Sequence, residues 1–195
     1  ARKSRGLGDV YKRQIMDNIV VKDSPDWLKN KLKSIGITPK NNIVDVTNYV
    51  MHDVGQPLHA FDYEKIDGST IVARKNNKIS DFITLDNDKK KLINDDLVIC
   101  DSKKPLCVAG IYGGLESGVS EITTTIFIES AYFSPTSIRK TSKRLGLSTD
   151  SSYRFERGID PELTVYALKR AVTIIKEICP AALVACDLID INSVS

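Results

Sequence analysis

Apolar residues recur at helical spacing in four stretches of the chain. In the first, Trp27 and later apolar residues follow a Ser24-Pro25 start, so we expect Ser24 to cap the helix and Trp27 to enter the core. The other helices are predicted over about 43–52, from Ser134 to Gly146, and from Asp160 to Pro180.

Short runs of β-branched and aromatic residues, separated by Gly, Asn and Asp, predict strands between the second and third helices. An extended segment at 57–62 precedes them, a final strand is expected at 182–189, and 148–153 is predicted to be a loop. Together these elements predict one mixed α/β (α+β) domain over residues 15–190, with a mixed β-sheet flanked by helices. The predicted strands are 70–74, 82–85, 91–93, 96–100, 106–111 and 125–129.

The two ends of the chain differ from the rest. Residues 1–14 carry five Lys or Arg and one acid, and the segment Asp9-Val10-Tyr11-Lys12-Arg13-Gln14 resembles a translated sequencing adapter. We therefore expect residues 1–14 to be a non-native tail, with a real basic tail as the alternative. We expect 191–195 to be a truncated end, so that the chain is a fragment of a longer protein.

Composition narrows the class of protein. A hydrophobic share of 42% and a charged share of 27% are ordinary for a globular domain, and no run approaches the roughly 18 apolar residues of a membrane span. The four cysteines show no metal-site spacing, so we expect buried free thiols, no metal, and a reducing, cytoplasmic location. They are Cys100, Cys107, Cys179 and Cys186.

Candidate chemistry concentrates in residues 41–62, which hold both histidines, His52 and His59. Thr47 and Asn48 lie within a short apolar helix, and Gly55-Gln56-Pro57 then turns the chain toward His59. This crowding of polar groups beside core residues predicts one wall of a binding pocket. The alternative for His59 is a core histidine whose hydrogen bonds are satisfied internally.

Two later features are candidates for the opposite wall. The run 110–118 holds four glycines in nine residues, which indicates close backbone approach, but it matches neither a Walker loop nor a dinucleotide fingerprint. Glu129 ends an apolar strand, so its carboxylate either pairs with an arginine or accepts a hydrogen bond from a ligand.

Basic residues gather between 139 and 157. Phosphate contact would use such a patch, whereas a solvated helix face is the alternative. The residues are Arg139, Lys140, Lys143, Arg144, Arg154 and Arg157.

Three long motifs carry a family resemblance: VDVTNYVMHDVGQPLHAFD, AGIYGGLESGV and IESAYFSPTSIRKTSKRLGLSTDSSYRFERGIDP. They resemble the β subunit of bacterial phenylalanyl-tRNA synthetases, and more narrowly its central editing domain, over about residues 24–180. The resemblance implies a mixed α/β fold that binds tRNA and hydrolyses tyrosine wrongly esterified to the phenylalanine tRNA. The alternative is a non-catalytic module of the same subunit that binds tRNA or braces the assembly.

The resemblance also implies site residues and partners. His59 and Glu129 would be catalytic, with Glu129 reading the tyrosine hydroxyl, and the basic residues 139–157 would meet tRNA. Partners would be tRNA(Phe), the synthetase α subunit and the rest of the β subunit, in a heterotetramer of two α and two β subunits, with no membrane. No cofactor is expected in this domain, while the parent synthetase uses ATP and Mg²⁺. The substrate pocket would hold Thr47, Asn48, Pro57, Gly113, Gly114, Thr149 and Ser151, the last standing where a smaller residue such as alanine is expected.

The chemistry of tyrosine rejection agrees with this assignment. The hydrophobic site at which a synthetase joins phenylalanine to tRNA discriminates only weakly, by roughly a hundredfold, against the one added hydroxyl of tyrosine. A second site must therefore require that hydroxyl. No Ser-His-Asp or Cys-His set is evident, so we expect a positioned water to attack the ester. His59 would orient this water or accept its proton, a tRNA ribose hydroxyl would assist, and backbone N–H groups around Gly113 and Gly114 would stabilise the oxyanion.

Overall fold

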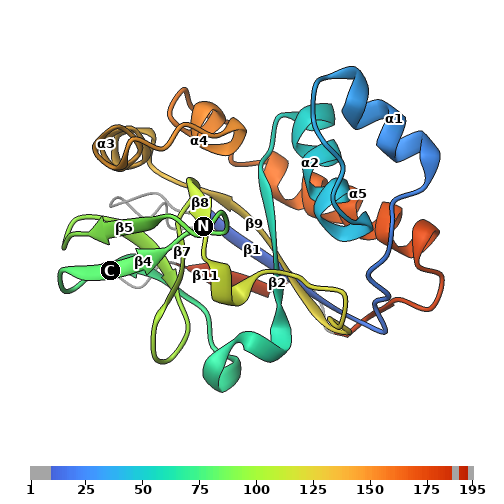
Figure 1. The fold of residues 1–195 in the computed structure, drawn as a ribbon, viewed down its shortest axis with the longest axis horizontal. Helices are drawn as coiled ribbons and strands as arrows, with labels where there is room; N and C mark the ends of the chain where they lie inside the picture. The colour runs from blue at the N-terminus through green and yellow to red at the C-terminus, as the bar shows by residue number, and fades with distance from the viewer. Residues whose placement is uncertain (1–9, 186–188, 193–195) are drawn as a thin grey trace.

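The computed structural model describes residues 10–185 and 189–192 (Figure 1). The predictions made for residues 1–9, Cys186 and 193–195 concern residues outside these ranges. No helix in the described part combines the length and apolar character needed to cross a bilayer.

A first antiparallel sheet forms the centre of the domain. Among the described residues its strand order is β10 (Leu183–Val184), β1 (Val10–Asp17), β9 (Ile126–Tyr132) and β2 (Leu58–Asp62). β11 (Ile189–Asn192) also pairs with β1. The strand order differs from the chain order, so segments far apart in sequence meet side by side.

The sequence prediction excluded residues 10–14 from the fold, and the structure corrects this. Val10 pairs with Tyr132 and Gln14 with Ile128, which places the segment between β9 and the C-terminal strands. The central strand therefore begins within the stretch that was set aside. That residues 1–14 are non-native stays a prediction.

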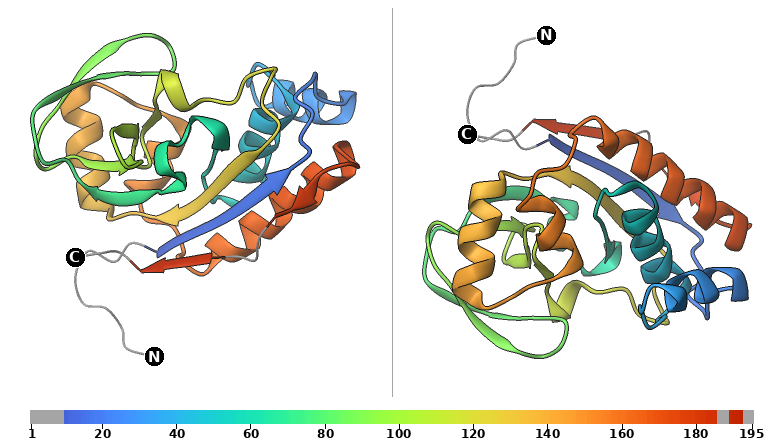
Figure 2. Two further views of the ribbon diagram at one scale, coloured as in Figure 1. Left: turned by 90° about the horizontal axis from the view of Figure 1, so that it is seen from below. Right: turned by 90° about the horizontal axis from the view of Figure 1, so that it is seen from above.

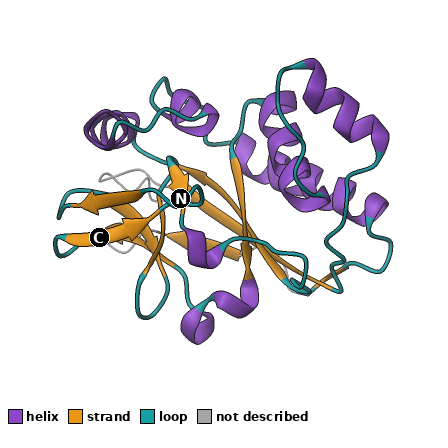
Figure 3. Cartoon of the chain, viewed as in Figure 1, coloured by secondary structure: helices purple, strands orange, loops and turns teal. Residues whose placement is uncertain are grey.

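A second antiparallel sheet and a hairpin lie beside the first sheet (Figure 3). The hairpin is formed by β4 (Ser80–Ile83) and β5 (Lys89–Leu92). The described strands of the second sheet are, in order, β3 (Val72–Lys75), β6 (Leu97–Cys100), β7 (Pro105–Val108) and β8 (Tyr112–Gly113). Short 3₁₀ turns at Tyr63–Lys65, Asp67–Ser69 and Leu115–Ser117 connect these elements.

Helices gather at two ends of the sheets (Figures 1 and 2). Helix α5 (Leu163–Ile178) packs on β1 and β9 and on α2 (Asn42–Val54), which in turn contacts α1 (Asp26–Ser34). At the other end, α3 (Pro135–Leu145) packs on β6 and α4 (Asp150–Phe155). The prediction of a mixed α/β domain with strands flanked by helices is confirmed.

Strand β9 separates two hydrophobic clusters because successive side chains point to opposite faces. Ile126 and Ile128 join the cluster with Val46 and Leu168. Phe127 joins the other cluster, with Phe61 and Leu106. Glu129 shares the face of Phe127, and its cross-strand neighbour on β1 is Arg13, whose guanidinium lies 5.9 Å from the centroid of the Phe127 ring.

Three local predictions were wrong. Pro25 is the N-cap of α1, because the Ser24 hydroxyl donates instead to the buried Asp45 carboxylate at 2.5 Å. Trp27 is 44% exposed, with its ring edge-on to Tyr49. Residues 150–155 form α4, because Thr149 and Ser152 make a reciprocal capping box.

Candidate functional site

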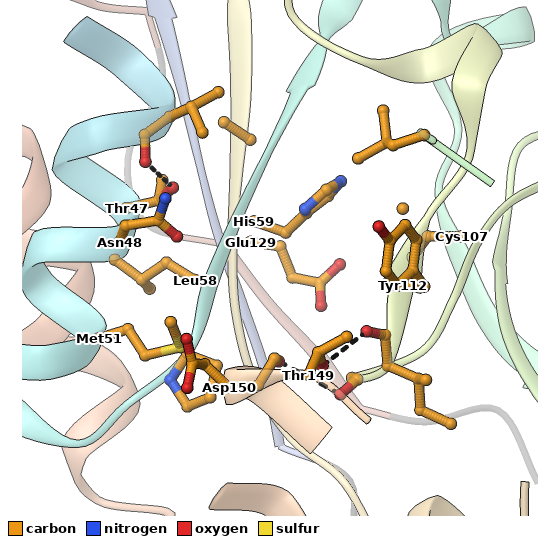
Figure 4. Close-up of a pocket in the computed structure, with 18 of the residues that line it drawn as sticks. Thr47, Asn48, Met51, Leu58, His59, Cys107, Tyr112, Glu129, Thr149 and Asp150 are labelled. Atoms are coloured by element: carbon orange, nitrogen blue, oxygen red, sulfur yellow. Dashed lines mark hydrogen bonds between the residues drawn. The ribbon is translucent and has the colours of Figure 1, made fainter. Parts of the chain in front are cut away.

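A cavity of about 570 Å³ lies between α2, the paired strands β2 and β9, β7 and β8, and the start of α4 (Figure 4). This volume is typical of small-molecule sites. The structure brings together eight of the nine sequence-predicted catalytic and pocket residues here, all except Gly114: Thr47, Asn48, Pro57, His59, Gly113, Glu129, Thr149 and Ser151.

His59 and Glu129 form the floor of the cavity. They are directly opposite each other in the antiparallel pairing of β2 and β9, so both side chains point to the same face. The next pair on that face is Phe61 and Phe127, whose rings lie 5.9 Å apart. The strand register alone therefore places the acid and the imidazole side by side.

The His59 imidazole is held neutral. Burial lowers its pKa to about 4, although the residue as a whole is only partly buried. The ring stands edge-on to Phe61 at 4.4 Å, and its Nε2 is buried without a hydrogen-bond partner in the described part of the chain. The alternative of a core histidine with internally satisfied hydrogen bonds does not describe this ring.

The Glu129 side chain lies within the core layer, where the residue is only 5% exposed, and it reaches the cavity (Figure 4). Cys107, which also lines the cavity, is affected by this carboxylate. Burial raises the pKa of the Cys107 thiol well above its usual value, and the negative charge of Glu129 raises it further. Cys107 is therefore an un-ionised, unreactive wall residue.

Helix α2 forms the second wall and is fixed at both ends. Asn41 caps it by accepting hydrogen bonds from the Ile43 and Val44 backbone N–H groups, and Gly55 ends it in the left-handed conformation. Thr47 donates its hydroxyl to the Val44 carbonyl at 2.7 Å. Thr47 therefore shapes the wall, and its proton is already used within the helix.

The start of α4 forms a third wall that is tied to the glycine-rich loop. Thr149 donates to the Ile111 carbonyl at 3.0 Å, and Ser151 donates to the Gly110 carbonyl at 3.2 Å. The additional hydroxyl of Ser151, compared with alanine, therefore has an acceptor within the protein.

The two predicted wall glycines behave differently. A Cβ at Gly113 would lie 2.7 Å from Leu85 Cδ1 and 2.9 Å from His59 Cε1, so both side chains pack onto this glycine. Gly114 lies outside the cavity lining. Its N–H donates to the Leu106 carbonyl at 2.9 Å, so it is unavailable to an oxyanion, contrary to the expectation from the sequence.

Sequence reasoning missed several lining residues, among them Leu85, Tyr112 and Asp150. Burial and the nearby Asp86 carboxylate raise the pKa of the Tyr112 phenol. Leu85 follows β4 and reaches the cavity because its N–H donates to the Gly113 carbonyl at 3.1 Å. No sequence pattern announces that long-range contact.

His52, on α2, lies outside the cavity lining, and its side chain contacts α4. Its Nδ1 accepts from Arg154 at 3.0 Å, and its Nε2 is 3.7 Å from the Asp150 carboxylate. Burial and the Arg154 charge lower the pKa of His52. Across the described residues, no group of three His, Cys, Asp or Glu side chains is arranged to hold a metal ion.

The six basic residues of the predicted patch are not equivalent. All four arginines donate to acceptors within the protein: Arg139 to the Glu156 carbonyl, Arg144 to Lys91 and Asp96, Arg154 to Asp150 and His52, and Arg157 to Tyr153 and Glu156. Lys140 and Lys143 are exposed on α3.

Comparison with known proteins places this chain in a family. The chain is 54% identical over 169 residues to the phenylalanine–tRNA ligase β subunit of Porphyromonas gingivalis, and 48% identical over 168 residues to that of Salinibacter ruber. Each alignment covers 86% of this chain and 20–21% of the relative, so the chain spans about a fifth of those proteins.

A solved structure supports the fold. The N-terminal fragment of the phenylalanyl-tRNA synthetase β subunit from Pyrococcus horikoshii matches with a TM-score of 0.55 and 15% identity, over 96% of this chain and 51% of that one. The family match itself covers residues 8–180 and is described as the B3/4 domain. The resemblance read from the sequence motifs is confirmed, and the chain belongs to the B3/4 domain family.

Proposed function

We propose that this domain is an editing module of a phenylalanine–tRNA ligase β subunit, hydrolysing the ester between tyrosine and tRNA(Phe). One observation carries the proposal: the Glu129 carboxylate and a neutral His59 imidazole share the floor of one cavity of about 570 Å³. The relatives of this chain are named as β subunits of that ligase. Tyrosine differs from phenylalanine by one hydroxyl, so a ligase for phenylalanine separates the two amino acids poorly by size.

Selectivity follows from the environment of Glu129. A tyrosine hydroxyl donates a hydrogen bond to the buried carboxylate, whereas a phenyl ring leaves that carboxylate without this donor and still displaces water. One added hydrogen bond to a buried charged group contributes about 1–3 kcal/mol, which is roughly a 5- to 150-fold preference for tyrosine. The apolar residues Leu85, Val108 and Ile111 hold the ring body.

Hydrolysis needs a water molecule to attack the ester carbonyl carbon. The carbon–oxygen ester bond then breaks, free tyrosine leaves, and the tRNA ribose hydroxyl recovers a proton. With a pKa of about 4, His59 is a weak proton acceptor near neutrality, but its neutral ring can still donate or accept a hydrogen bond. We therefore assign His59 to orienting the water, with the ribose hydroxyl assisting proton transfer.

The domain acts within a larger assembly in this proposal. ATP and Mg²⁺ serve the synthetic reaction elsewhere, and no cofactor is required for ester hydrolysis here. The α subunit and the rest of the β subunit deliver the charged tRNA in a cytoplasmic heterotetramer.

The second candidate is a non-catalytic module that braces the subunit or holds tRNA. The internal hydrogen bonds of Arg139, Arg144, Arg154 and Arg157 favour a structural contribution from those residues. Deacylation of Tyr-tRNA(Phe) by the complete synthetase, with His59→Ala and Glu129→Ala variants, separates the two functions. If the domain edits, both variants lose deacylation activity. If both variants deacylate at the wild-type rate, the non-catalytic role is the candidate that remains.

A further inference from the structure

Arg154, one of the basic residues singled out in the sequence, makes a bridge between two helices. Its side chain is only 21% exposed. The guanidinium Nη1 donates to the Asp150 carbonyl at 2.8 Å, one turn earlier on α4. Its Nη2 lies 3.0 Å from His52 Nδ1, on α2. One planar group therefore holds the start of α4 and a side chain of α2 at the same time.

This bridge fixes the tautomer of His52. An arginine side chain has donors and no acceptor, so His52 Nδ1 must accept, and the neutral ring carries its proton on Nε2. Nε2 is buried, and it has no hydrogen-bond partner in the described part of the chain. It lies 3.7 Å from the Asp150 carboxylate, which is too long for a hydrogen bond. The hydrogen bond from Arg154 is therefore the contact that holds the ring.

The two helices that the bridge joins are two walls of the cavity (Figure 4). His52 directly follows a lining residue of α2, and Arg154 lies one helical turn after a lining residue of α4. Neither His52 nor Arg154 lines the cavity itself. The bridge therefore lies behind the walls. The lining residues are Thr47, Asn48 and Met51 on α2, and Thr149, Asp150 and Ser151 at the start of α4.

The position of α4 depends on such contacts. The helix has six residues, so tertiary packing must hold it in place. Thr149 and Ser151 attach its start to the glycine-rich loop, through the carbonyls of residues 111 and 110. Arg154 attaches it to α2. Without the bridge, α4 would stay bound to the loop, but its distance from α2 would no longer be fixed. Loss of the bridge should therefore change the width of the cavity more than it changes the fold.

We propose that Arg154 and His52 are positioning residues for the hydrolysis, and that the hydrogen bond between them sets the spacing of the α2 and α4 walls. Neither side chain touches the substrate in this role. The inference rests on the proposed function, because it concerns the same cavity. It assigns Arg154 to the frame of the cavity and not to phosphate contact, the role that its charge alone suggests.

The chain offers a matched control for this bridge. Arg170, on α5, donates from Nε to the Asp53 carboxylate at 3.0 Å, so it also joins α2 to another helix. Asp53 is the residue after His52, yet neither Arg170 nor Asp53 lines the cavity. Removing this second bond loosens α2 in the same chemical way and leaves the contact between α2 and α4 intact.

The test measures kcat and KM for deacylation of Tyr-tRNA(Phe) by the complete synthetase, with melting temperatures for every variant. Arg154→Met and His52→Leu remove the bridge, whereas His52→Asn keeps an acceptor, because its amide oxygen is bonded to Cγ as Nδ1 is in histidine. We expect kcat to fall about 10- to 100-fold in the first two variants at an unchanged KM, since a misplacement of about 1 Å can cost up to about a hundredfold. Combining them should slow the reaction no further, because both remove one bond. His52→Asn and the control Arg170→Met should keep the wild-type kcat.

A wild-type kcat in Arg154→Met, or equal falls in His52→Asn and His52→Leu, would overturn the positioning role. An equal fall in Arg170→Met would also overturn it, because the effect would then be a general loss of helix packing. A raised KM at an unchanged kcat in Arg154→Met would overturn it in favour of RNA contact. A wild-type synthetase that fails to deacylate Tyr-tRNA(Phe) would refute the proposed function and this role together, whereas an active wild type with unaffected variants would refute this role alone.

Discussion

His59 and Glu129 are cross-strand partners, directly opposite each other in β2 and β9, and both line the same cavity. Because side chains alternate along a strand, a shift of one residue in this register would turn one of them away from the cavity. Phe61 and Phe127, the next pair on that face, fix the register through their buried rings. The site geometry is therefore a consequence of core packing.

The buried imidazole makes stability depend on pH. His59 has a folded pKa of about 4 against an ordinary value of 6.5, so between these values the unfolded chain binds more protons. Stability should therefore fall as the pH drops from 6.5 toward 4. We expect His59 to account for about 2 kcal/mol of the loss between pH 7.5 and pH 5.

Denaturant unfolding of wild-type, His59→Gln and His52→Gln proteins at both pH values measures this contribution. Between pH 7.5 and pH 5, the unfolding free energy of the His59 variant should fall less than that of wild type. The His52 variant should still show the fall of about 2 kcal/mol that His59 causes. An identical pH dependence in wild type and His59→Gln would contradict the buried neutral imidazole.

Alanine at the two adjacent glycines should separate activity from stability. In Gly113→Ala the new Cβ displaces the ends of two side chains, His59 and Leu85, so the domain should fold while hydrolysis falls by up to about a hundredfold. In Gly114→Ala the new Cβ would lie 2.5 Å from the Leu106 carbonyl oxygen, so we expect a loss of about 1–3 kcal/mol in unfolding free energy. Deacylation rates and melting curves for both variants test these two expectations. Full activity in Gly113→Ala would show that the position of His59 is unimportant.

Two hydroxyls on the α4 wall should differ in their effect. Thr149→Ala removes both the capping box and the bond to the Ile111 carbonyl, so a loss of about 1–2 kcal/mol is expected. Ser151→Ala removes only the bond to the Gly110 carbonyl and should cost about 1 kcal/mol or less, with hydrolysis nearly unchanged. Equal unfolding free energies for the two variants would rule out the capping role.

The sequence was informative where local chemistry decides the structure. Helical spacing located α1, α2, α3 and α5, and the motif residues identified most of the cavity. It failed where a distant partner changes a local preference: Asp45 takes the hydroxyl of Ser24 from its expected cap, and β9 recruits residues 10–14 into the sheet. Helix α4 was missed because Ser152 takes the capping-box position at which Glu or Gln is the usual signal.

The lining residues that went unpredicted share one cause. Leu85 and Tyr112 reach the cavity through the pairing of the hairpin and β8, and these contacts depend on how the sheets pack. Gly114 was misplaced for the same reason, since strand pairing with Leu106 uses its N–H. Such contacts leave no periodic signal in the amino-acid sequence.

The central claim is that the carboxylate at position 129 requires the tyrosine hydroxyl. Its most direct test is the ratio of deacylation rates for Tyr-tRNA(Phe) and Phe-tRNA(Phe) in the wild-type synthetase and in Glu129→Ala. The account predicts a wild-type preference for the tyrosyl ester that falls roughly 5- to 150-fold in the variant. An unchanged ratio, with both esters hydrolysed as in the wild type, would contradict it.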